Sequence, residues 1–327
     1  MQGVSVPFLE LKNLTRDFEV RTSRLPARTT LLRAVDHVSL HVDQGQTLGL
    51  VGESGCGKST LGQMVVGLVP PTRGDVCLQG RPLWDSGSYE EPHVRRKIQM
   101  IFQDPSSSLN PRMRVKKIIG EGLDIHRMGS RAQRTARVAA LMEMTGILPE
   151  HGNRYAHEFS GGQRQRISLA RALSLDPQLI VCDEPVSALD VSIQAQILNL
   201  LVDLQKNLGL TYIFISHDLA VVRKVSHRVA VMYLGRIVEI ADGNDLYENP
   251  CHPYTRALLA AVPRPDPRRG VPKIALAGEI PSPLAPPSGC VFHPRCPRAM
   301  DICSRNIPGD MEVGPGHHVK CFLFKTV

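Results

Sequence analysis

The segment GESGCGKST at Gly52–Thr60 constrains this chain more than any other feature. It matches the pattern G-x-x-x-x-G-K-[ST], between a predicted strand at Thr47–Val51 and a predicted helix from Lys58 to about Gly67. Glycines let backbone N–H groups wrap around phosphate oxygens, and the start of a helix adds partial positive charge. Lys58 adds a full charge for the β- and γ-phosphates, and the hydroxyl of Ser59 can bind Mg²⁺. The segment therefore predicts a nucleotide-binding site.

Apolar segments alternate with helical patterns along most of the chain. Strands are expected at Phe8–Leu14, Val38–Val42, Thr47–Val51, Ile98–Phe102, Leu179–Cys182 and Tyr212–Ile215, and as a hairpin of Val229–Tyr233 with Arg236–Ile240. Helices are expected at 160–175 and 192–208, and residues 112–150 form a polar, helix-prone insertion. This alternation predicts an α/β sandwich around a mostly parallel sheet.

Two carboxylates, Asp183 and Glu184, follow the apolar run Leu179–Cys182, which predicts a buried parallel strand. An acidic side chain at the end of such a strand can hold Mg²⁺ through water, and a second beside it can polarise a water molecule for attack. A helix N-cap is the alternative for this pair of residues. The P-loop pattern upstream favours a role at the nucleotide.

The segment FSGGQ at Phe159–Gln163 predicts a second helix start that can bind an anion. One nucleotide does not need two phosphate cradles from the same chain. We therefore expect this segment to contact a nucleotide bound by a partner chain, through Ser160, Gly161, Gly162 and Gln163.

In their order, these motifs resemble those of the ATP-binding subunits of ABC transporters over about residues 8–250. The resemblance implies a P-loop NTPase fold of the ABC type, with an inserted helical subdomain at about 104–175 and with ATP and Mg²⁺ as cofactors. It implies that Mg²⁺ is held through Ser59, Gln103 and Asp183. Glu184 is then the catalytic glutamate.

The same resemblance implies roles for further residues. His217 becomes the switch histidine beside the γ-phosphate, although a lone histidine at a strand end is usually structural. Asp190, in the D-loop, joins the FSGGQ segment in contacting the partner's nucleotide. Phe18 is the candidate for stacking on adenine, with a plain core phenylalanine as the alternative. The implied ATP contacts are Phe18, Gly52, Glu53, Ser54, Gly55, Cys56, Gly57, Lys58, Ser59, Thr60 and Gln103.

Three more segments, Phe102–Arg112, Asn249–Thr255 and Gly278–Pro283, resemble the ATP-binding subunits of dipeptide and oligopeptide importers. Such an importer has two ATP-binding subunits, usually different homologous chains, two membrane permeases and an extracytoplasmic substrate-binding protein. The implied function is ATP hydrolysis that powers peptide import, by a peripheral protein on the cytoplasmic face of the inner membrane. An importer of nickel or another small solute is the alternative, because its subunits are closely similar.

Composition weakens other classes of function. The chain has 39 Lys and Arg against 31 Asp and Glu, but much of the excess lies within residues 112–137, so we expect no nucleic-acid partner. A solvated helical face explains that stretch, with contact to a partner or an anionic membrane surface as the alternative. No run approaches the ~18 apolar residues that cross a bilayer, and the N-terminus lacks a signal-peptide layout. A soluble ABC ATPase of translation or DNA repair usually carries two cassettes, and a P-loop kinase has no use for FSGGQ.

Composition changes near residue 250, which separates an expected ATP-binding domain, 1–250, from a Pro- and Cys-rich C-terminal tail, 251–327. The Pro-rich stretch 262–289 is expected to be extended. Because the tail has few apolar residues, it can hardly build a hydrophobic core of its own and needs a stabilising cross-link. Disulfides are disfavoured in a reducing cytosol.

Four thiols in the tail could supply that cross-link by binding either zinc or an Fe–S cluster. The third possible state of these cysteines is free thiols. These thiols belong to Cys290, Cys296, Cys303 and Cys321. The family resemblance implies a [4Fe–4S] cluster, with Zn²⁺ as the alternative. His293, His317 and His318 are expected to be solvated surface residues.

Overall fold

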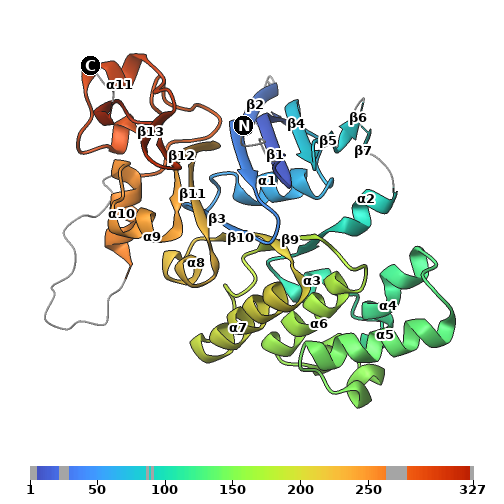
Figure 1. Cartoon of the computed structure of the whole chain (residues 1–327). Coiled ribbons are helices and arrows are strands. Elements are labelled where there is room, and N and C mark those ends of the chain that lie inside the picture. Colours follow the sequence, from blue (N-terminus) through green and yellow to red (C-terminus); the bar gives the residue numbers. More distant parts are fainter. Residues whose placement is uncertain (1–5, 22–28, 86–87, 90–91, 263–277, 325–327) are drawn as a thin grey trace, which may run out of the picture. The chain divides into compact units, whose positions relative to one another are not determined.

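The structure is a computed structural model that describes residues 6–21, 29–85, 88–89, 92–262 and 278–324 (Figure 1). The chain divides into two compact units. Unit 1 draws on residues 1–43, 47–89 and 216–327, and unit 2 on residues 44–46 and 90–215. Residues 263–277, more than half of the expected extended stretch, lie outside the described residues.

An antiparallel sheet carries the N-terminal strands of unit 1. Its strand order is β2-β1-β4-β5, with bounds β1 Leu9–Arg21, β2 Thr29–Val42, β4 Arg73–Leu78 and β5 Arg81–Pro82. In its second half β2 alternates buried and exposed side chains, because one face of the sheet packs on the core. The short strands β6 (Trp84–Asp85) and β7 (Ser88–Tyr89) pair separately.

The second sheet of unit 1 positions the P-loop. Strand β3 (Thr47–Val51) is buried at every residue and pairs in parallel with β11 (Arg228–Tyr233). Strand β12 (Arg236–Asp242) forms the expected antiparallel hairpin with β11. The helices of unit 1 are α1 (Lys58–Val65), α8 (Leu219–Val225), α9 (Gly243–Glu248), α10 (Pro253–Ala261) and α11 (Asp301–Arg305), with 3-10 helices η3 (His293–Arg295) and η4 (Phe322–Phe324).

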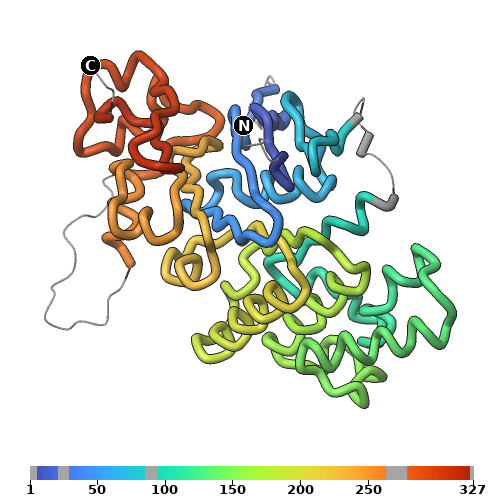
Figure 2. Tube along the Cα trace, viewed as in Figure 1, coloured from blue at the N-terminus to red at the C-terminus, as the bar shows by residue number. Residues whose placement is uncertain are grey.

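The tail extends this sheet and packs on unit 1 (Figure 2). Strand β14 (His317–Val319) pairs with β12, and β13 (Met311–Gly314) pairs with β14. Phe292 and Val319, at 1% and 0% exposure, are buried in unit 1. The last part of the tail, from residue 278 on, therefore completes its apolar packing with residues from β11, β12 and α10.

Unit 2 combines three parallel strands with a group of helices. The strand order is β10-β9-β8, with bounds β8 Ile98–Ile101, β9 Leu179–Asp183 and β10 Thr211–Ser216. Helices α4, α5, α6 and α7 pack beside one another (Figure 1). The helices are α2 (Pro92–Lys97), α3 (Pro105–Ser108), α4 (Val115–Ile125), α5 (Arg131–Met144), α6 (Gly161–Leu173) and α7 (Val191–Leu208), with η1 (Pro149–Asn153) and η2 (Ala156–Glu158).

Local sequence explains where these helices start and stop. Ser130 and Gln133 form a capping box at the start of α5. Gly209, with φ of 65°, ends α7 in the left-handed conformation that glycine tolerates. The expected helical insertion at 112–150 is confirmed as α4 and α5.

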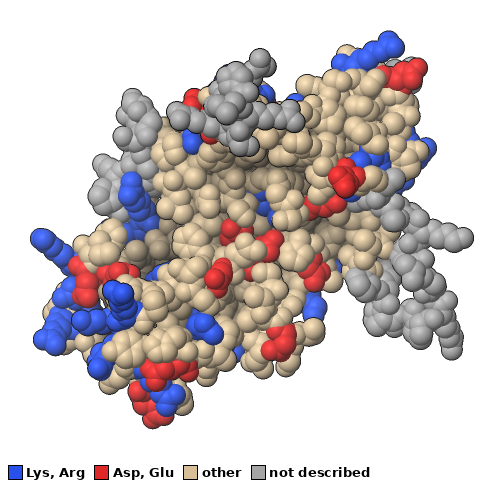
Figure 3. All heavy atoms as spheres, turned by 180° about the vertical axis from the view of Figure 1, so that it is seen from behind, with Lys and Arg blue, Asp and Glu red and all other residues tan. Residues whose placement is uncertain are grey.

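Part of the basic stretch within residues 112–137 lies on the surface of unit 2. Arg112, Arg114, Lys116 and Lys117 are exposed, and Figure 3 shows Lys and Arg gathered on the surface of unit 2, at the lower left. Within the described ranges, no helix is both long enough and apolar enough to span a bilayer.

Candidate functional site

The P-loop (residues 52–60) joins β3 to α1 in unit 1, in the setting that the sequence predicts. Helix α1 starts after Gly57, which has φ of 107° and supplies no side-chain cap. Gly52 and Gly55 also have positive φ, at 154° and 77°. The backbone therefore follows a path that glycine tolerates and that lets N–H groups face a bound anion.

Close packing requires glycine at two of these positions. A Cβ atom at Gly52 would lie 2.1 Å from the carbonyl oxygen of Met232 in β11. A Cβ atom at Gly57 would lie 2.1 Å from the carbonyl oxygen of Ala34 in β2. The glycines thus seat the P-loop against two strands of unit 1.

Lys58 places a buried positive charge over the loop. Its Nζ donates to the carbonyl oxygens of Gly52, at 2.7 Å, and Glu53, at 3.0 Å, and lies 3.8 Å from Sγ of Cys56. Phosphate oxygens are charged acceptors and bind an ammonium more strongly than carbonyls do. Burial raises the pKa of the Cys56 thiol, and the lysine only partly offsets this. This thiol gives no sign of a catalytic role.

In unit 2 the structure brings together two of the residues that the sequence singles out. Gln103 follows β8, and its Nε2 donates to Oε2 of Glu184 at 2.9 Å. Glu184 follows the buried Asp183 at the end of β9 and has a positive φ of 45°. Strands β8 and β9 run parallel, so their carboxyl ends share one edge. A non-glycine residue with positive φ is strained, and strain of this kind clusters at functional sites.

The FSGGQ segment starts α6 with a capping box. Ser160 Oγ accepts from the backbone N–H of Gln163, and the Gln163 side chain accepts from the backbone N–H of Ser160. A Cβ atom at Gly162 would lie 2.3 Å from Ile193 in α7, so glycine allows α6 and α7 to approach. Phe159 is buried, as an apolar residue at this position should be.

Three other predicted residues lie in separate settings. Asp190 caps α7 and accepts from the backbone N–H of Ile193 at 3.0 Å. His217 is exposed directly after β10. Phe18 lies in β1 and is half-buried, with the guanidinium of Arg16 4.5 Å from its ring centroid. The nucleotide roles of these residues stay predictions.

The sequence analysis missed two residues that hold the P-loop, Tyr254 and Arg295. The backbone N–H of Glu53 donates to the hydroxyl of Tyr254 at 2.9 Å, and Arg295 forms an ion pair with the Glu53 carboxylate at 2.7 Å. The hydrogen bond to Glu53 raises the pKa of Arg295 further. Tyr254 lies in the segment Asn249–Thr255 that resembles peptide-importer subunits. No local pattern links it or Arg295 to Glu53, because more than 200 positions separate each from that residue.

The four tail thiols lie within electrostatic reach of one another. Burial, and then the charges of Cys290, Cys296 and Cys303, raise the pKa of the Cys321 thiol to about 11. The backbone N–H of Cys290 donates to the carbonyl oxygen of Cys303 at 2.8 Å, which ties two parts of the tail together. A bound cation would offset both burial and repulsion, because it stabilises the thiolate form.

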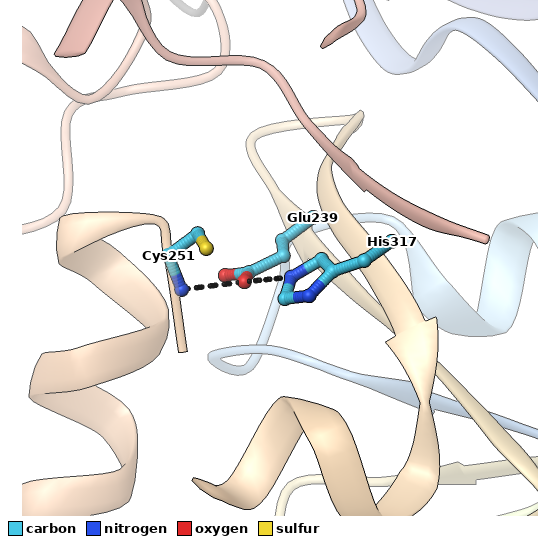
Figure 4. A group of neighbouring side chains, drawn as sticks. All are labelled: Glu239, Cys251 and His317. Atoms are coloured by element: carbon cyan, nitrogen blue, oxygen red, sulfur yellow. Dashed lines mark hydrogen bonds and ion pairs between the residues drawn. The ribbon is translucent and has the colours of Figure 1, made fainter. Parts of the chain in front are cut away.

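A different group brings Glu239, Cys251 and His317 within 4.8 Å of one another (Figure 4). His317 Nε2 bonds Glu239 at 2.8 Å and its Nδ1 bonds Asp245 at 2.6 Å. The other contacts of Glu239 are the backbone N–H groups of Cys251 and His252. Protein partners thus already occupy both ring nitrogens and both oxygens of Glu239, which explains the group as a structural ion cluster.

The expectation of a solvated His317 is wrong. The residue is 3% exposed, because β14 carries it between β12 and α9. The hydrogen bonds that His317 donates to Glu239 and Asp245 raise its pKa, against the lowering effect of burial. A buried imidazole between two carboxylates is stabilised in its charged form.

Comparisons with protein families agree with the motif order. The ABC transporter family model matches residues 35–187, and the model of the oligopeptide/dipeptide transporter C-terminal region matches residues 238–303. The first match spans the P-loop, Gln103, the FSGGQ segment and Glu184. The match to the C-terminal region begins in β12 and ends at Cys303.

Individual relatives cover nearly the whole chain. A Brucella ovis protein named as a peptide import ATP-binding protein is 51% identical over 96% of this chain and 97% of its own length. The oligopeptide transport ATP-binding protein AppF of Bacillus subtilis is 50% identical over 97% of each chain.

Solved structures agree at the level of the fold. CbiO1 of Clostridium perfringens, part of an ABC transporter complex, has a TM-score of 0.62 and 25% identity, covering 74% of this chain and 91% of its own. The ATP-binding cassette MJ0796, solved as a dimer with ADP and phosphate, has a TM-score of 0.62 and 26% identity, covering 72% and 98%. These matches confirm the expected P-loop α/β fold.

Proposed function

Because this chain belongs to the ATP-binding proteins of ABC transporters, we propose that it hydrolyses ATP to power the import of di- or oligopeptides through membrane permeases. The observation that carries the proposal is the presence of two family matches on one chain. The ABC match accounts for ATP and Mg²⁺ as cofactors, and the C-terminal match accounts for the peptide-importer branch. Relatives named for peptide import at about 50% identity support the same branch.

We propose that the P-loop and Lys58 bind the phosphates of ATP, with Mg²⁺ held through Ser59, Gln103 and Asp183. The hydrogen bond between Gln103 and Glu184 supports a shared role for this pair at the water and the metal. Glu184 orients or deprotonates the attacking water, and His217 contacts the γ-phosphate. Phe18 remains the candidate for adenine stacking, where Arg16 now covers one face of its ring.

The FSGGQ segment and Asp190 are proposed to contact a nucleotide bound by a second ATP-binding subunit. The dimer of MJ0796 with ADP and phosphate supports a paired arrangement for this family. A homologous but different chain is the proposed partner, together with two permeases and an extracytoplasmic binding protein. The chain then works as a peripheral protein on the cytoplasmic face of the inner membrane. Residues 1–250 form the proposed ATP-binding domain and 251–327 the importer-type tail.

The test is peptide uptake by the assembled transporter in vesicles. We expect ATP hydrolysis that rises when the binding protein is loaded with a short peptide, and accumulation of that peptide. Stimulation by Ni²⁺ and not by peptides would support the alternative, a nickel or small-solute importer. Hydrolysis that responds to neither solute would contradict both.

We also propose that Cys290, Cys296, Cys303 and Cys321 hold a [4Fe–4S] cluster, with Zn²⁺ as the alternative. The proposal is supported by the resemblance of this cysteine pattern to the tails of dipeptide-importer ATP-binding subunits, and by the electrostatic influence of the four thiols on one another. Four thiolates suit either metal group. Either group would supply a structural cross-link for the tail.

Metal analysis after anaerobic purification tests this second proposal. About four irons per chain and broad absorption at the blue end of the spectrum are expected. One zinc per colourless chain would support the alternative. Cys296→Ser should lose the metal, and the matched control Cys77→Ser, in β4, should keep it. Absence of both metals from the wild-type protein would contradict the proposal.

A further inference from the structure

Glu53 places a negative charge inside a loop that is built to bind anions. It is the residue after Gly52 in the P-loop, and its side chain is 23% exposed. A carboxylate at this position repels the phosphates of a nucleotide unless a cation compensates it. The backbone carbonyl of Glu53 also accepts a hydrogen bond from Lys58, so the position of this residue affects the lysine.

Arg295 of the tail compensates this charge through a two-pronged ion pair. Its Nη1 donates to Oε2 of Glu53 at 2.7 Å, and its Nη2 donates to Oε1 at 3.1 Å. Paired bonds of this kind fix orientation as well as charge. The Arg295 side chain is 5% exposed, so solvent and salt screen the pair less than they screen a surface ion pair.

Aromatic packing explains why the arginine reaches the P-loop. Phe292 lies against Tyr233 of β11 and Tyr254 of α10, with ring centroids 5.2 and 5.4 Å away. The 3-10 helix η3 follows Phe292 directly and ends at Arg295, whose guanidinium lies 5.9 Å from the Tyr233 ring centroid. Phe292 therefore anchors the segment that delivers Arg295.

The same aromatic group holds the backbone of Glu53. Tyr254 is fully buried, and its hydroxyl accepts from the Glu53 backbone N–H at 2.9 Å. Tyr233 and Tyr254 pack edge to face at 4.7 Å. The carboxylate, the N–H and the carbonyl of Glu53 are thus all fixed, the first two by residues from the C-terminal part of the chain.

We propose that Arg295 is a positioning residue for nucleotide binding: it neutralises and orients Glu53, so that the tail sets the affinity of the P-loop for phosphates. The inference rests on the proposed binding of ATP by the P-loop. Arg295 does not touch the nucleotide in this scheme. Arg295 affects the affinity for phosphates indirectly, because it compensates the charge of Glu53 and fixes the backbone of the loop, which Lys58 also contacts.

The experiment measures binding of ATP, ADP and AMP to full-length chain variants by fluorescence competition. Arg295→Ala leaves the Glu53 carboxylate unpaired, and ATP affinity should fall by about three- to tenfold. The loss should grow from AMP to ATP, because repulsion scales with ligand charge. A structural defect in the tail would not produce that order.

A double variant isolates the charge. Glu53→Gln in the Arg295→Ala background removes the unpaired carboxylate and should restore ATP affinity to within about twofold of wild type. The ATP affinity of Arg295→Lys should lie between those of the wild type and Arg295→Ala. A lysine keeps the positive charge but loses the paired hydrogen bonds of the guanidinium group. Arg305→Ala removes an exposed charge from α11 of the same tail and should change nothing, which controls for long-range electrostatics.

Three results of the binding experiment would overturn the inference. They are wild-type affinity in Arg295→Ala, an equal loss for AMP and ATP, and failure of Glu53→Gln to restore affinity. If the wild-type chain itself failed to bind ATP, the proposed function would be wrong rather than the role of Arg295. Thermal melting of each variant separates a local change at the loop from unfolding, and an affinity loss that follows the melting temperature also counts against the inference.

Discussion

Helices α1 and α6 both start at glycine-containing segments, yet their first turns differ. The N-cap of α1 is Gly57, which offers no side-chain cap. The N-cap of α6 is Ser160, which forms a reciprocal capping box with Gln163. A helix start without a side-chain cap is suited to take a phosphate as its cap, whereas a self-capped start must exchange a hydrogen bond before it can bind one.

This difference suggests a division of labour between the two helix starts. Under the proposed function, the P-loop before α1 binds the chain's own nucleotide, and α6 contacts a second nucleotide that a partner brings. Changes in unit 1 around α1 should therefore alter affinity, whereas changes in unit 2 should alter turnover. Three experiments test the division, and a fourth tests the stability of the tail, in order of decreasing expected effect.

The largest effect is expected from Glu184→Gln in unit 2. Loss of the general base should lower ATP hydrolysis by ~10²–10⁴-fold, while ATP binding by the isolated chain stays unchanged. Turnover by the reconstituted transporter, with the partner's equivalent site disabled, measures this. Glu143→Gln, an exposed carboxylate of α5, serves as the control and should keep full activity. Near-normal hydrolysis in Glu184→Gln would remove the catalytic assignment.

Substitution of Ser160 by arginine tests α6 directly. The Ser160→Arg side chain should block the approach of the partner's nucleotide and lower hydrolysis by about 10²-fold or more. Binding of ATP to the isolated chain should stay within about twofold, because the P-loop is untouched. Equilibrium binding and steady-state hydrolysis are measured on the same preparation. Loss of monomer binding would show that both helix starts serve one nucleotide.

The matching change in unit 1 is Lys58→Ala. Removing a charge-assisted hydrogen bond costs about 1.5–3 kcal/mol, so ATP affinity should fall by roughly 10- to 100-fold. Titration with a fluorescent ATP analogue measures the affinity, and Lys206→Ala in α7 provides a matched lysine control. Unchanged affinity with slower hydrolysis would assign Lys58 to chemistry alone and break the proposed division.

The smallest effect is expected from pH, through the tail. Glu239 and Asp245 raise the pKa of His317 above 6.5, so the histidine stabilises the tail fully below that pH and less as pH rises through its folded pKa. The pKa of Asp245 is lowered from 3.8, so its contribution is present above that pH and is lost on further acidification. The folded tail should therefore be most stable between the pKa of Asp245 and the pKa of His317.

Amide hydrogen exchange in β13 and β14, followed between pH 6 and 9, tests this. After correction for the intrinsic pH dependence of exchange, opening of the tail should increase a few-fold toward high pH, and α6 should show no such change. His317→Gln should abolish the pH dependence. A profile that is flat in the wild-type protein would exclude the histidine as its source.

The features that the sequence could predict are those formed by residues close to one another along the chain. The P-loop between a strand and a helix, the strand before Asp183 and the helix start at the FSGGQ segment each depend on residues within a few positions of one another, and all appear where expected. The Gln103–Glu184 contact was not predicted, although the parallel pairing of β8 and β9, which brings their carboxyl ends to one edge, accounts for it. Resemblance to a family then supplied the roles.

The contacts that the sequence could not predict join residues that lie far apart along the chain. Nothing near Arg295 indicates that its partner is Glu53, and nothing near His317 indicates burial beside Glu239. Both contacts depend on the path of the tail over β11 and β12, which a Pro- and Cys-rich composition does not specify. Histidines and arginines in such a segment look solvated until the strands that cover them are known.

The pairing of β3 with β11 has a consequence for biosynthesis. Val51 lies opposite Val231, so about 180 further residues must be translated before the strand that carries the P-loop gains this neighbour. At typical elongation rates that delay is on the order of ten to forty seconds. Residues 90–215 of unit 2 emerge from the ribosome during this interval. We expect nascent chains stalled at residue 215 to expose β3 to protease, and chains released at full length to protect it.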